Sequence, residues 1–437
     1  MLFSIWPLLR KTLPLQPMKY YDIIVIGAGP AGLVAAGRAA EKGKKVLVLE
    51  KMPQEGRKLK ITGKGRCNIT NDSPMKDFIK QVYPNGRFLK NAFHRFFSED
   101  IIQLLEKHGV ECKLERGGRY FPVSDRAADV LNALLAWNKS LNVDILLNHP
   151  VKRLIIEDSS IKGVHAEGQD FPAGKVIIAT GGKSYPATGS TGDGYMLAKQ
   201  AGHSLEAPQP ALVPLETERD IPHILQGLKL KNVQAAVWVN DKKKTDAFGE
   251  LEFMPYGLSG PIILTLSRNV VAELQRGSNV DIYIDLKPAL DDKKLDNRLQ
   301  RELNENGKKK ISTLFKNLLP AALIPLFLDL TRLNPDKECH QISAQERKKI
   351  RYYLKNMPFK ISGYRSFKEA IITAGGILTN EISSKTMESK LTKGLYFAGE
   401  VMDLDADTGG YNLQIAYSTG WLAGDASAAK DSSAEDD

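Results

Sequence analysis

Hydrophobic runs and glycine turns alternate along the first part of the chain. The run Ile23–Ile26 is short, β-branched and followed by glycine, as expected for a strand buried on both faces of a sheet. A helix of small residues is predicted from about Pro30 to Lys42, and Val46–Leu49 gives a second buried strand. This order of strand, helix and strand is typical of the start of a doubly wound sheet.

The hydrophobic pattern changes several times farther along. Residues 88–137 are predicted to be mostly helical with a turn at "GGRYFP", and strands then lead to Val176–Ala179. After residue 207, short alternating strands such as Val233–Val239 and Asp281–Asp285 predict a β-rich insert, which we interpret as a barrel. Residues 291–355 are helical and highly charged. The segment "GLYFAGEVMD" then resumes the strand-and-turn pattern, and a helix follows.

These elements predict an α/β protein whose Rossmann-like, dinucleotide-binding domain is discontinuous. That domain is expected to comprise residues 19–206 and 356–424. The insert at 207–355 divides into a β-barrel, about 207–290, and a helical part, about 291–355. Residues 1–18 are expected to be a disordered extension, with Met18 as an alternative start, and 425–437 a disordered tail.

The composition indicates a cellular compartment and several classes of binding partner. The formal charge of +10 fits solubility, a phosphate-bearing ligand or weak contact with nucleic acid. Cys67, Cys112 and Cys339 are odd in number and lack CxxC spacing, which favours a reducing, cytoplasmic setting. The apolar stretch before Arg10 is far shorter than the roughly 20 residues that span a bilayer, so no membrane anchor is expected.

The first chemical motif is GxGxxG at Gly27-Ala28-Gly29-Pro30-Ala31-Gly32, between the first strand and its helix. The glycines allow a tight turn, close approach of a pyrophosphate and close helix–strand packing, and the helix start offers free N–H groups. Glu50 ends the second strand and is placed to accept from ribose hydroxyls. An acid there disfavours a 2′-phosphate, so the nucleotide is predicted to be FAD or NAD.

Two later elements favour FAD. "VIIATGG", Val176 to Gly182, is a strand that ends at the same sheet edge, and "GLYFAGEVMD" is a second such strand with Gly399-Glu400 at its turn. "ATGG" alone is also compatible with an ordinary strand end. Together, the two elements resemble the closure of FAD-binding flavoproteins related to glutathione reductase.

A more specific resemblance rests on five segments in order: "GRKLKITGKGRCNITN", "GGKSYPATGSTGDGY", "MPYGLSGPIILTLSR", "ITAGGI" and "GLYFAGEVMDLDADTGGYNLQIAYSTGWLAG". From about Tyr20 to Gly424 the chain resembles the bacterial flavoprotein family of BaiN, RsdA and aminoacetone oxidase. The resemblance implies an FAD domain interrupted by a β-barrel with attached helices. Lys64 departs from the small residue frequent there. Family members act on different substrates, so the cofactor is implied more firmly than the reaction.

The glycine-rich segment Gly56–Asn71 carries five cationic side chains and no acid. We interpret it as a loop around FAD, in which Arg57, Lys58 and Arg66 face phosphates or the pyrimidine edge of the flavin. Positive charge at that edge would stabilise the anionic reduced flavin. A solvated basic turn is the alternative, and loss of FAD retention or a shifted flavin potential in Arg66→Ala would distinguish the two.

No catalytic acid or base stands out. Cys67 is either a redox partner of the flavin or a small buried filler, and Tyr185 and Tyr411 are pocket walls or ordinary packing residues. Glu400 is expected to accept from the ribityl chain rather than act as a general base. No metal-ligand spacing is visible, so no metal is predicted. The predicted cofactor-binding residues are Gly27, Ala28, Gly29, Pro30, Ala31, Gly32, Glu50, Lys51, Arg57, Lys58, Thr62, Gly63, Gly65, Arg66, Cys67, Asn68, Val151, Ala179, Thr180, Gly181, Gly182, Gly399, Glu400, Gly410, Asn412, Leu413 and Gln414.

The predicted function is that of an FAD-dependent oxidoreductase that transfers hydride at flavin N5 to or from a small organic substrate. No second GxGxxG follows Lys183, so NAD(P)H is expected at most as a transient electron donor. An oxygen-using amine oxidase of the aminoacetone-oxidase type is the alternative. An RNA-associated flavoprotein is less favoured, because "ERKKIRYYLK" with Tyr352 and Tyr353 is the only hint of cations interleaved with aromatics.

Overall fold

A twisted, mainly parallel sheet forms the centre of the larger domain in the computed structural model, which describes residues 20–429. Strands β7 (Asp144–Leu146), β2 (Val46–Leu49), β1 (Tyr21–Ile26), β10 (Gln169–Ile178) and β19 (Leu395–Phe397) lie side by side and pair in parallel. The first half of β10 instead continues an antiparallel meander with β9 (Ser160–Ala166) and β8 (Val151–Glu157). The predicted Rossmann-like sheet is therefore confirmed.

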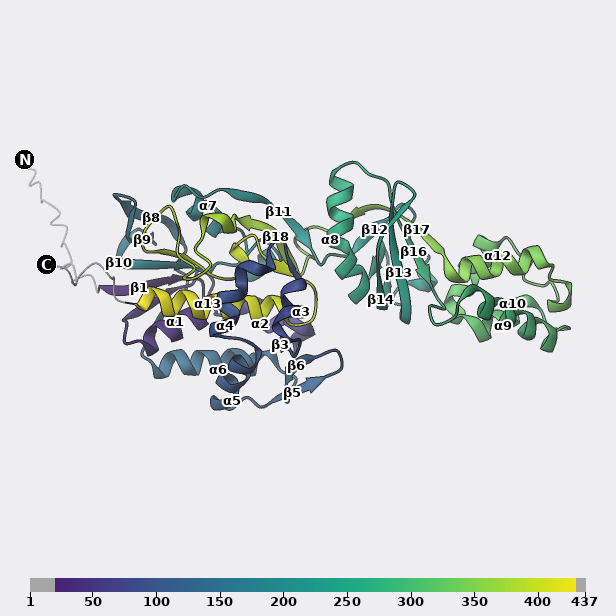
Figure 1. Cartoon of the computed structure of the whole chain (residues 1–437), viewed down its shortest axis with the longest axis horizontal. Coiled ribbons are helices and arrows are strands. Elements are labelled where there is room, and N and C mark those ends of the chain that lie inside the picture. Colours follow the sequence, from purple (N-terminus) through teal and green to yellow (C-terminus); the bar gives the residue numbers. More distant parts are fainter. Residues whose placement is uncertain (1–19, 430–437) are drawn as a thin grey trace, which may run out of the picture.

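Helix α1 (Pro30–Glu41) packs against the last helix of the described chain, α13 (Tyr411–Ala428). Figure 1 shows the two side by side below the sheet. Their contact is very close, because a Cβ added at Gly420 would lie 2.3 Å from the carbonyl oxygen of Ala31, and one at Gly424 would lie 2.3 Å from that of Ala35. Glycine at these two positions thus allows the ends of the domain to join.

The insert contains a closed, antiparallel six-stranded barrel in the order β12 (Leu215–Thr217), β15 (Gly257–Ser259), β14 (Lys242–Met254), β13 (Lys229–Val239), β16 (Val280–Asp285) and β17 (Met357–Tyr364). The predicted barrel is confirmed. Its closing strand, β17, lies beyond the expected boundary at residue 355 and pairs with both β12 and β16. The boundary differs because the helical segment interrupts the barrel rather than following it.

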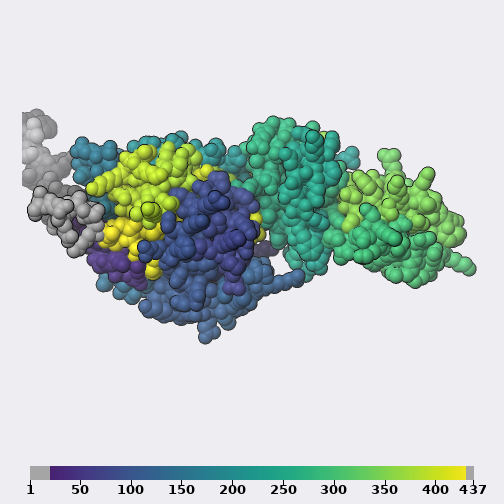
Figure 2. All heavy atoms as spheres, in the orientation of Figure 1, coloured from purple at the N-terminus to yellow at the C-terminus, as the bar shows by residue number. Residues whose placement is uncertain are grey.

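The helical segment forms a lobe at the far end of the molecule. It comprises α9 (Asp292–Glu305), α10 (Ile311–Leu318), α11 (Ile324–Thr331) and α12 (Ala344–Lys355). Its apolar side chains share one buried cluster with the barrel, separate from the cluster around the parallel sheet. The FAD-type domain, the barrel and this helical lobe follow one another in a row (Figures 1 and 2).

The remaining elements complete the larger domain and its junction with the insert. Strands β5 (Cys112–Glu115) and β6 (Arg119–Pro122) form a hairpin, so "RYFP" is a strand rather than the predicted turn.

No helix among residues 20–429 has the length and apolar character needed to cross a membrane. The other bounds are α2 (Arg57–Ile61), β3 (Thr70–Asn71), α3 (Met75–Lys80), β4 (Val82–Tyr83), α4 (Lys90–Arg95), α5 (Ser98–Lys107), α6 (Ala127–Ser140), α7 (Asp193–Gln200), β11 (Leu205–Ala211), α8 (Pro261–Gln275), β18 (Ile372–Ile377) and β20 (Asp405–Ala406).

The domain and its insert are joined by a two-stranded ribbon and by a partly buried cation. Strands β11 and β18 pair with each other where the chain enters and leaves the insert. Arg268, on α8 of the insert, ion-pairs with Asp405 and lies over the ring of Tyr83, 4.5 Å from its centre. Both partners belong to the larger domain, so this arginine crosses the junction. The predicted extension at residues 1–18 and most of the tail at 425–437 lie outside the described residues.

Candidate functional site

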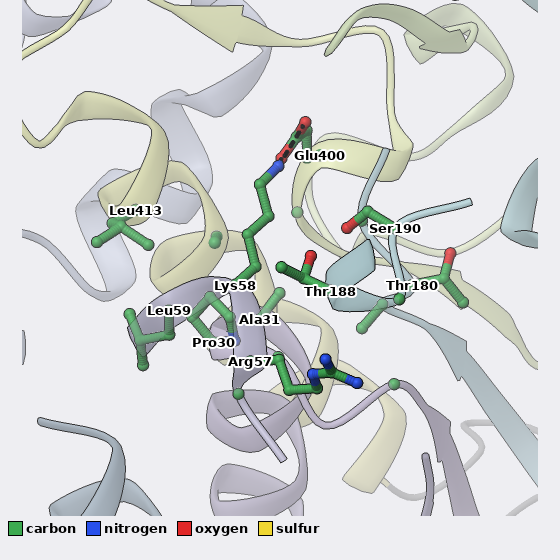
Figure 3. Close-up of a pocket in the computed structure, with 18 of the residues that line it drawn as sticks. Pro30, Ala31, Arg57, Lys58, Leu59, Thr180, Thr188, Ser190, Glu400 and Leu413 are labelled. Atoms are coloured by element: carbon green, nitrogen blue, oxygen red, sulfur yellow. Dashed lines mark hydrogen bonds and ion pairs between the residues drawn. The ribbon is translucent and has the colours of Figure 1, made fainter. Parts of the chain in front are cut away.

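A cavity of about 320 Å³ lies at the carboxyl ends of the parallel strands. Its wall includes Ile26 at the end of β1, Leu49 at the end of β2, Thr180 just after β10 and Ala398 just after β19. Segments from both halves of the discontinuous domain therefore meet there, as the close-up in Figure 3 shows for part of the wall. Ligands of open α/β sheets bind at this edge.

The glycine turn forms one end of the cavity. Gly27 has a φ of +104°, and a Cβ there would lie 2.7 Å from the carbonyl oxygen of Ala179. A Cβ on Gly32 would lie 1.9 Å from the carbonyl oxygen of Gly27, so this position requires glycine for packing. Gly29 differs, because no atom lies within 4 Å of a Cβ built on it. Its Cα faces open space in the cavity, at the start of α1.

Glu50 is fixed beside that turn. The backbone N–H of Ala28 donates to its Oε2 at 2.8 Å, and that of Met52 donates to its Oε1 at 2.8 Å. Next to it, Lys51 Nζ lies 2.6 Å from Oδ2 of Asp193 at the start of α7. Burial favours the neutral acid of Asp193, but the Lys51 ammonium and the Thr191 hydroxyl outweigh it and lower the pKa of Asp193. Two carboxylates, those of Glu50 and Asp193, thus line this part of the cavity together with Lys51.

The start of α13 forms another part of the wall. Gly409 and Gly410 have φ angles of +132° and +99°, and a Cβ on Gly410 would lie 2.5 Å from the backbone of Thr70. Asn412 holds the preceding turn, because its side chain accepts from the N–H of Ala406 at 2.9 Å and donates to the carbonyl of Ala406 at 2.7 Å. The free N–H groups at the start of this 18-residue helix attract negative charge.

A charged pair spans the cavity between the two halves of the domain. Lys58 Nζ on α2 lies 2.8 Å from Oε2 and 3.2 Å from Oε1 of Glu400, and it also donates to Ser184 Oγ at 2.6 Å. Figure 3 shows the lysine side chain extended toward the carboxylate. Glu400 Oε1 also accepts from the N–H of Thr373 at 2.8 Å and from Ser184 Oγ at 3.1 Å. The carboxylate is therefore held in one orientation by donors from three segments.

Arg66 does not lie on the cavity wall. Its guanidinium lies 2.5 Å from Oε1 of Glu115 and 2.6 Å from Oδ1 of Asp125, and it lies over Phe121, 4.2 Å from the ring centre. Hydrogen bonds to Glu115 and then Asp125 raise the pKa of Arg66. The arginine thus ties the loop to the β5–β6 hairpin. Of the three cations predicted to face the cofactor, Arg57 and Lys58 line the cavity.

The three candidates for chemistry also lie off the wall. Cys67 is fully buried, and burial raises the pKa of its thiol to about 12, so the thiol stays protonated at neutral pH. Tyr411 packs edge-to-face on Phe78 with ring centres 4.6 Å apart. Tyr185 has a φ of +52°, and its N–H donates to the carbonyl of Phe367 at 2.9 Å. These placements favour packing roles.

Most predicted cofactor-binding residues are brought together, since 20 of the 27 line the cavity. The seven that do not are Ala28, Gly32, Gly65, Arg66, Cys67, Gly182 and Gln414. Gln414 is fully buried and bridges Thr70 Oγ1 at 2.6 Å and Ser418 Oγ at 2.9 Å, so it fixes α13 to β3. Lining residues that sequence reasoning missed include Gln54, His149, Thr188, Ser190, Asp193, Leu212, Ile371, Ile372 and Asp407.

The wall has the features that a bound dinucleotide requires. Two helix starts, those of α1 and α13, open on one cavity, and Gly29 leaves room beside the first of them. Thr180 and Gly181 add the end of β10 to the same wall within the described residues 20–429. Within the same range, no group of three or more His, Cys, Asp or Glu side chains is arranged to hold a metal ion. The residues present therefore fit FAD.

Comparison with known proteins gives the family. The model of the HI0933-like protein Rossmann domain matches residues 21–426. The chain belongs to the HI0933-like family. It is 31% identical over 408 residues to the 3-dehydro-bile acid delta(4,6)-reductase of Clostridium scindens, covering 92% of this chain and 98% of that protein. It is also 31% identical over 417 residues to the ribosomal RNA dihydrouridine synthase of Escherichia coli, covering 95% of this chain and all of that protein.

Membership of the HI0933-like family confirms the resemblance and the prediction of an FAD-dependent oxidoreductase. A solved quinol-fumarate reductase with menaquinol molecules is similar in fold, with a TM-score of 0.50, 16% identity and coverage of 94% of this chain and 71% of that one. At that identity the likeness concerns the fold alone. The names of the two relatives indicate different substrates, so family membership alone does not define the substrate of this HI0933-like protein.

Proposed function

We propose that this protein reduces a carbon–carbon double bond conjugated to a carbonyl group. The names of the two full-length relatives carry the proposal, because a 3-dehydro-bile acid delta(4,6)-reductase and a dihydrouridine synthase both saturate such a bond. Bound FAD, reduced by a nicotinamide, supplies the hydride for the β-carbon, and a proton from water completes the α-carbon. The absence of a second GxGxxG motif supports transient docking of the nicotinamide.

The residues of the cavity take the following roles in this proposal. Glu50 would accept from the adenosine ribose, and the start of α1 would hold the pyrophosphate, since a Cβ built on Gly29 meets no atom within 4 Å there. Glu400, oriented by Lys58, accepts from the ribityl hydroxyls. The start of α13 at Gly410 would stabilise the negative charge that develops on the pyrimidine edge of the reduced flavin.

The substrate is placed at the apolar end of the cavity, near the entry to the insert. Leu212, Ile371 and Ile372 line the wall there, at the ends of the β11–β18 ribbon. Glu400 marks the same end, because Oε1 accepts from the N–H of Thr373 directly after Ile372. A flat, conjugated ring fits between this apolar wall and the flavin.

Two classes of substrate agree with this chemistry. The relative from Clostridium scindens suggests a small ring system such as a steroid, and the relative from Escherichia coli suggests a uracil base in RNA. The second class is favoured by charge, because residues 287–355 hold 16 Lys and Arg against 9 Asp and Glu, a net +7 of the total +10. An amine oxidase, the alternative from the sequence, has no support from the names of these two relatives. A cytoplasmic location remains part of the proposal, and it rests on three cysteines that are all unpaired.

Anaerobic rapid mixing tests the proposal. The FAD-loaded protein is bleached with NADH or NADPH, then mixed with a 4-en-3-one steroid, with a uridine-containing RNA, or with air. We expect the yellow colour to return faster with one of the conjugated substrates than with air, and a saturated product to form. Reduction by an amine rather than a nicotinamide, followed by fastest return of colour in air, would establish an oxidase and overturn the proposal.

A further inference from the structure

The basic helical lobe has a charge that the cavity does not use. Its net +7 resides in residues 287–355, whereas the other 368 residues of the chain contribute only +3. The lobe stands beyond the barrel and away from the FAD-type domain (Figures 1 and 2). Charge concentrated on one part of a protein acts on partners rather than on folding.

Helix α12 has two faces with different charge. On the inner face, arginines pair with carboxylates of α9, and on the outer face, lysines form no ion pair within residues 20–429. Arg347 and Arg351 lie 3.2 Å and 3.3 Å from carboxylate oxygens of Asp296 and Asp292 on α9. Ile350 and Leu354 are buried beneath the helix. On the outer face, Lys348 and Lys349 form no ion pair within residues 20–429, and Lys348 is exposed.

Aromatic rings continue this outer face onto the barrel. Tyr352 follows Lys348 by one helical turn, has 52% of its surface exposed, and its ring centre lies 5.3 Å from that of Tyr353. Helix α12 contacts strand β16, and Tyr283 of that strand continues the aromatic surface onto the barrel. Tyr283 in turn packs edge-to-face on Trp238 of β13, with ring centres 5.4 Å apart.

We propose that this stripe, defined by Lys348, Lys349, Tyr352, Tyr353, Tyr283 and Trp238, binds a single-stranded segment of RNA. Unmatched cations attract phosphates, and aromatic faces stack on bases; together they are the features of single-strand binding surfaces. An acidic peptide would use the lysines but not the rings. Cations with their own partners border the stripe: Lys243, opposite Trp238 on β14, is paired with Asp246 at 2.9 Å.

The choice of RNA over DNA rests on the proposed function, in which a uracil base is one substrate class. The stripe lies at the junction of barrel and helical lobe, where Figure 1 labels α12, β16 and β17, whereas the cavity lies in the FAD-type domain. A folded RNA that reaches both would be held at the stripe while one base enters the cavity. Binding at the stripe requires no reductant, so it can be measured separately from the reaction.

The test is fluorescence anisotropy of a labelled single-stranded RNA of about 12 nucleotides with the full-length, FAD-loaded protein. We expect Lys348→Ala/Lys349→Ala to weaken binding and to reduce the slope of log affinity against log salt by about 1.4, since each phosphate contact on a single strand contributes about 0.7. Tyr352→Ala should weaken binding by about 5- to 100-fold with an unchanged slope, and Tyr352→Phe should keep the affinity.

A matched control removes two exposed cations from α5 and α6 of the FAD-type domain, Lys107→Ala/Lys139→Ala, and should leave RNA binding unchanged. The Lys348→Ala/Lys349→Ala variant should still reduce a small conjugated substrate at the normal rate. Equal loss of binding in the control, equal competition by polyglutamate, equal affinity for DNA of the same sequence, or absence of binding would each overturn the assignment. RNA binding without reduction of any conjugated substrate would instead refute the proposed function alone.

Discussion

The ammonium of Lys58 lies 2.8 Å from Oε2 of Glu400, although the two residues are 342 positions apart in the sequence. One belongs to the segment before the insert and the other to the segment after it. Both side chains are about one-fifth exposed, at 22% and 20%, so water screens the pair only in part. The pair therefore joins the two halves of the domain at the wall of the cavity.

Replacing this lysine should weaken FAD binding. In Lys58→Met, Glu400 loses its counter-charge and the hydrogen bond that holds Oε2, and a charge-assisted hydrogen bond of about 1.5–3 kcal/mol corresponds to about 10- to 100-fold in the dissociation constant. Equilibrium titration of the apoprotein with FAD measures this. Lys60→Met, an exposed position on the same helix, is the control and should bind FAD normally. Equal affinities in the two variants would contradict the role given to Lys58.

Replacement of two glycines in the same turn should affect different properties, stability for one and FAD binding for the other. Gly32→Ala places a methyl group 1.9 Å from the carbonyl oxygen of Gly27, so we expect a loss of stability of about 3 kcal/mol. Gly29→Ala meets no atom within 4 Å, so the apoprotein should unfold at the normal temperature while FAD binding is lost. Thermal unfolding with and without FAD separates the effects, and an FAD-induced rise in melting temperature in Gly29→Ala would refute the pyrophosphate site.

The position of Arg66 changes what its replacement should do. Because the guanidinium binds Glu115 and Asp125, Arg66→Ala should loosen the loop against the β5–β6 hairpin while FAD affinity stays close to normal. Arg57→Ala, on the cavity wall, should lower FAD affinity instead. FAD titration of both variants, together with the flavin reduction potential, is the measurement. A shifted potential in Arg66→Ala would restore the role expected from the sequence.

Asp403 should make stability depend on pH. Burial, then Glu206, raises the pKa of this carboxyl to about 6, whereas Arg268 lowers it. The native state thus binds more protons than the unfolded state between about pH 4 and 6, so stability falls as pH rises through this window. Asp403→Asn should remove this dependence and stabilise the protein at pH 7 by about 1 kcal/mol, a value reduced for screening by solvent.

Chemical denaturation across the same pH range measures that effect. Glu167→Gln, in an exposed turn between β9 and β10, removes one carboxylate elsewhere and should leave the pH profile unchanged. A profile of Asp403→Asn that matches the parent protein would mean that the Asp403 carboxyl is already hydrated.

Local patterns could predict the parallel sheet and one end of the cavity. The GxGxxG turn, α1 and Glu50 lie within 30 residues, and strand and helix periodicity define them directly. The position of Arg66 could not be predicted in this way, because its partners Glu115 and Asp125 are 49 and 59 positions away. Charge in a glycine-rich loop indicates affinity for anions but does not distinguish a phosphate from a carboxylate of the same chain.

The barrel illustrates the same limit for strands. The alternation of polar and apolar residues predicted β13 and β16, which pair with each other. The other edge of β16 pairs with β17, and β17 follows the whole helical lobe in the sequence. Similarly, Thr188, Ser190 and Asp193 lie in the glycine-rich stretch "ATGSTGDGY", whose glycines were the available signal. The position of β17 in the barrel and of these three residues on the cavity wall depends on contacts between distant segments, which the periodicity of a single segment does not reveal.

The close contact of α1 with α13 bears on synthesis of the protein. Gly420 and Gly424 are made almost four hundred positions after the Ala31 and Ala35 carbonyls that they touch. While the ribosome is still translating the barrel and the helical lobe, the emerging polypeptide contains only the cavity-lining segments that precede the insert. Insertion of the coenzyme must therefore wait until α13 has been synthesised and has packed on α1.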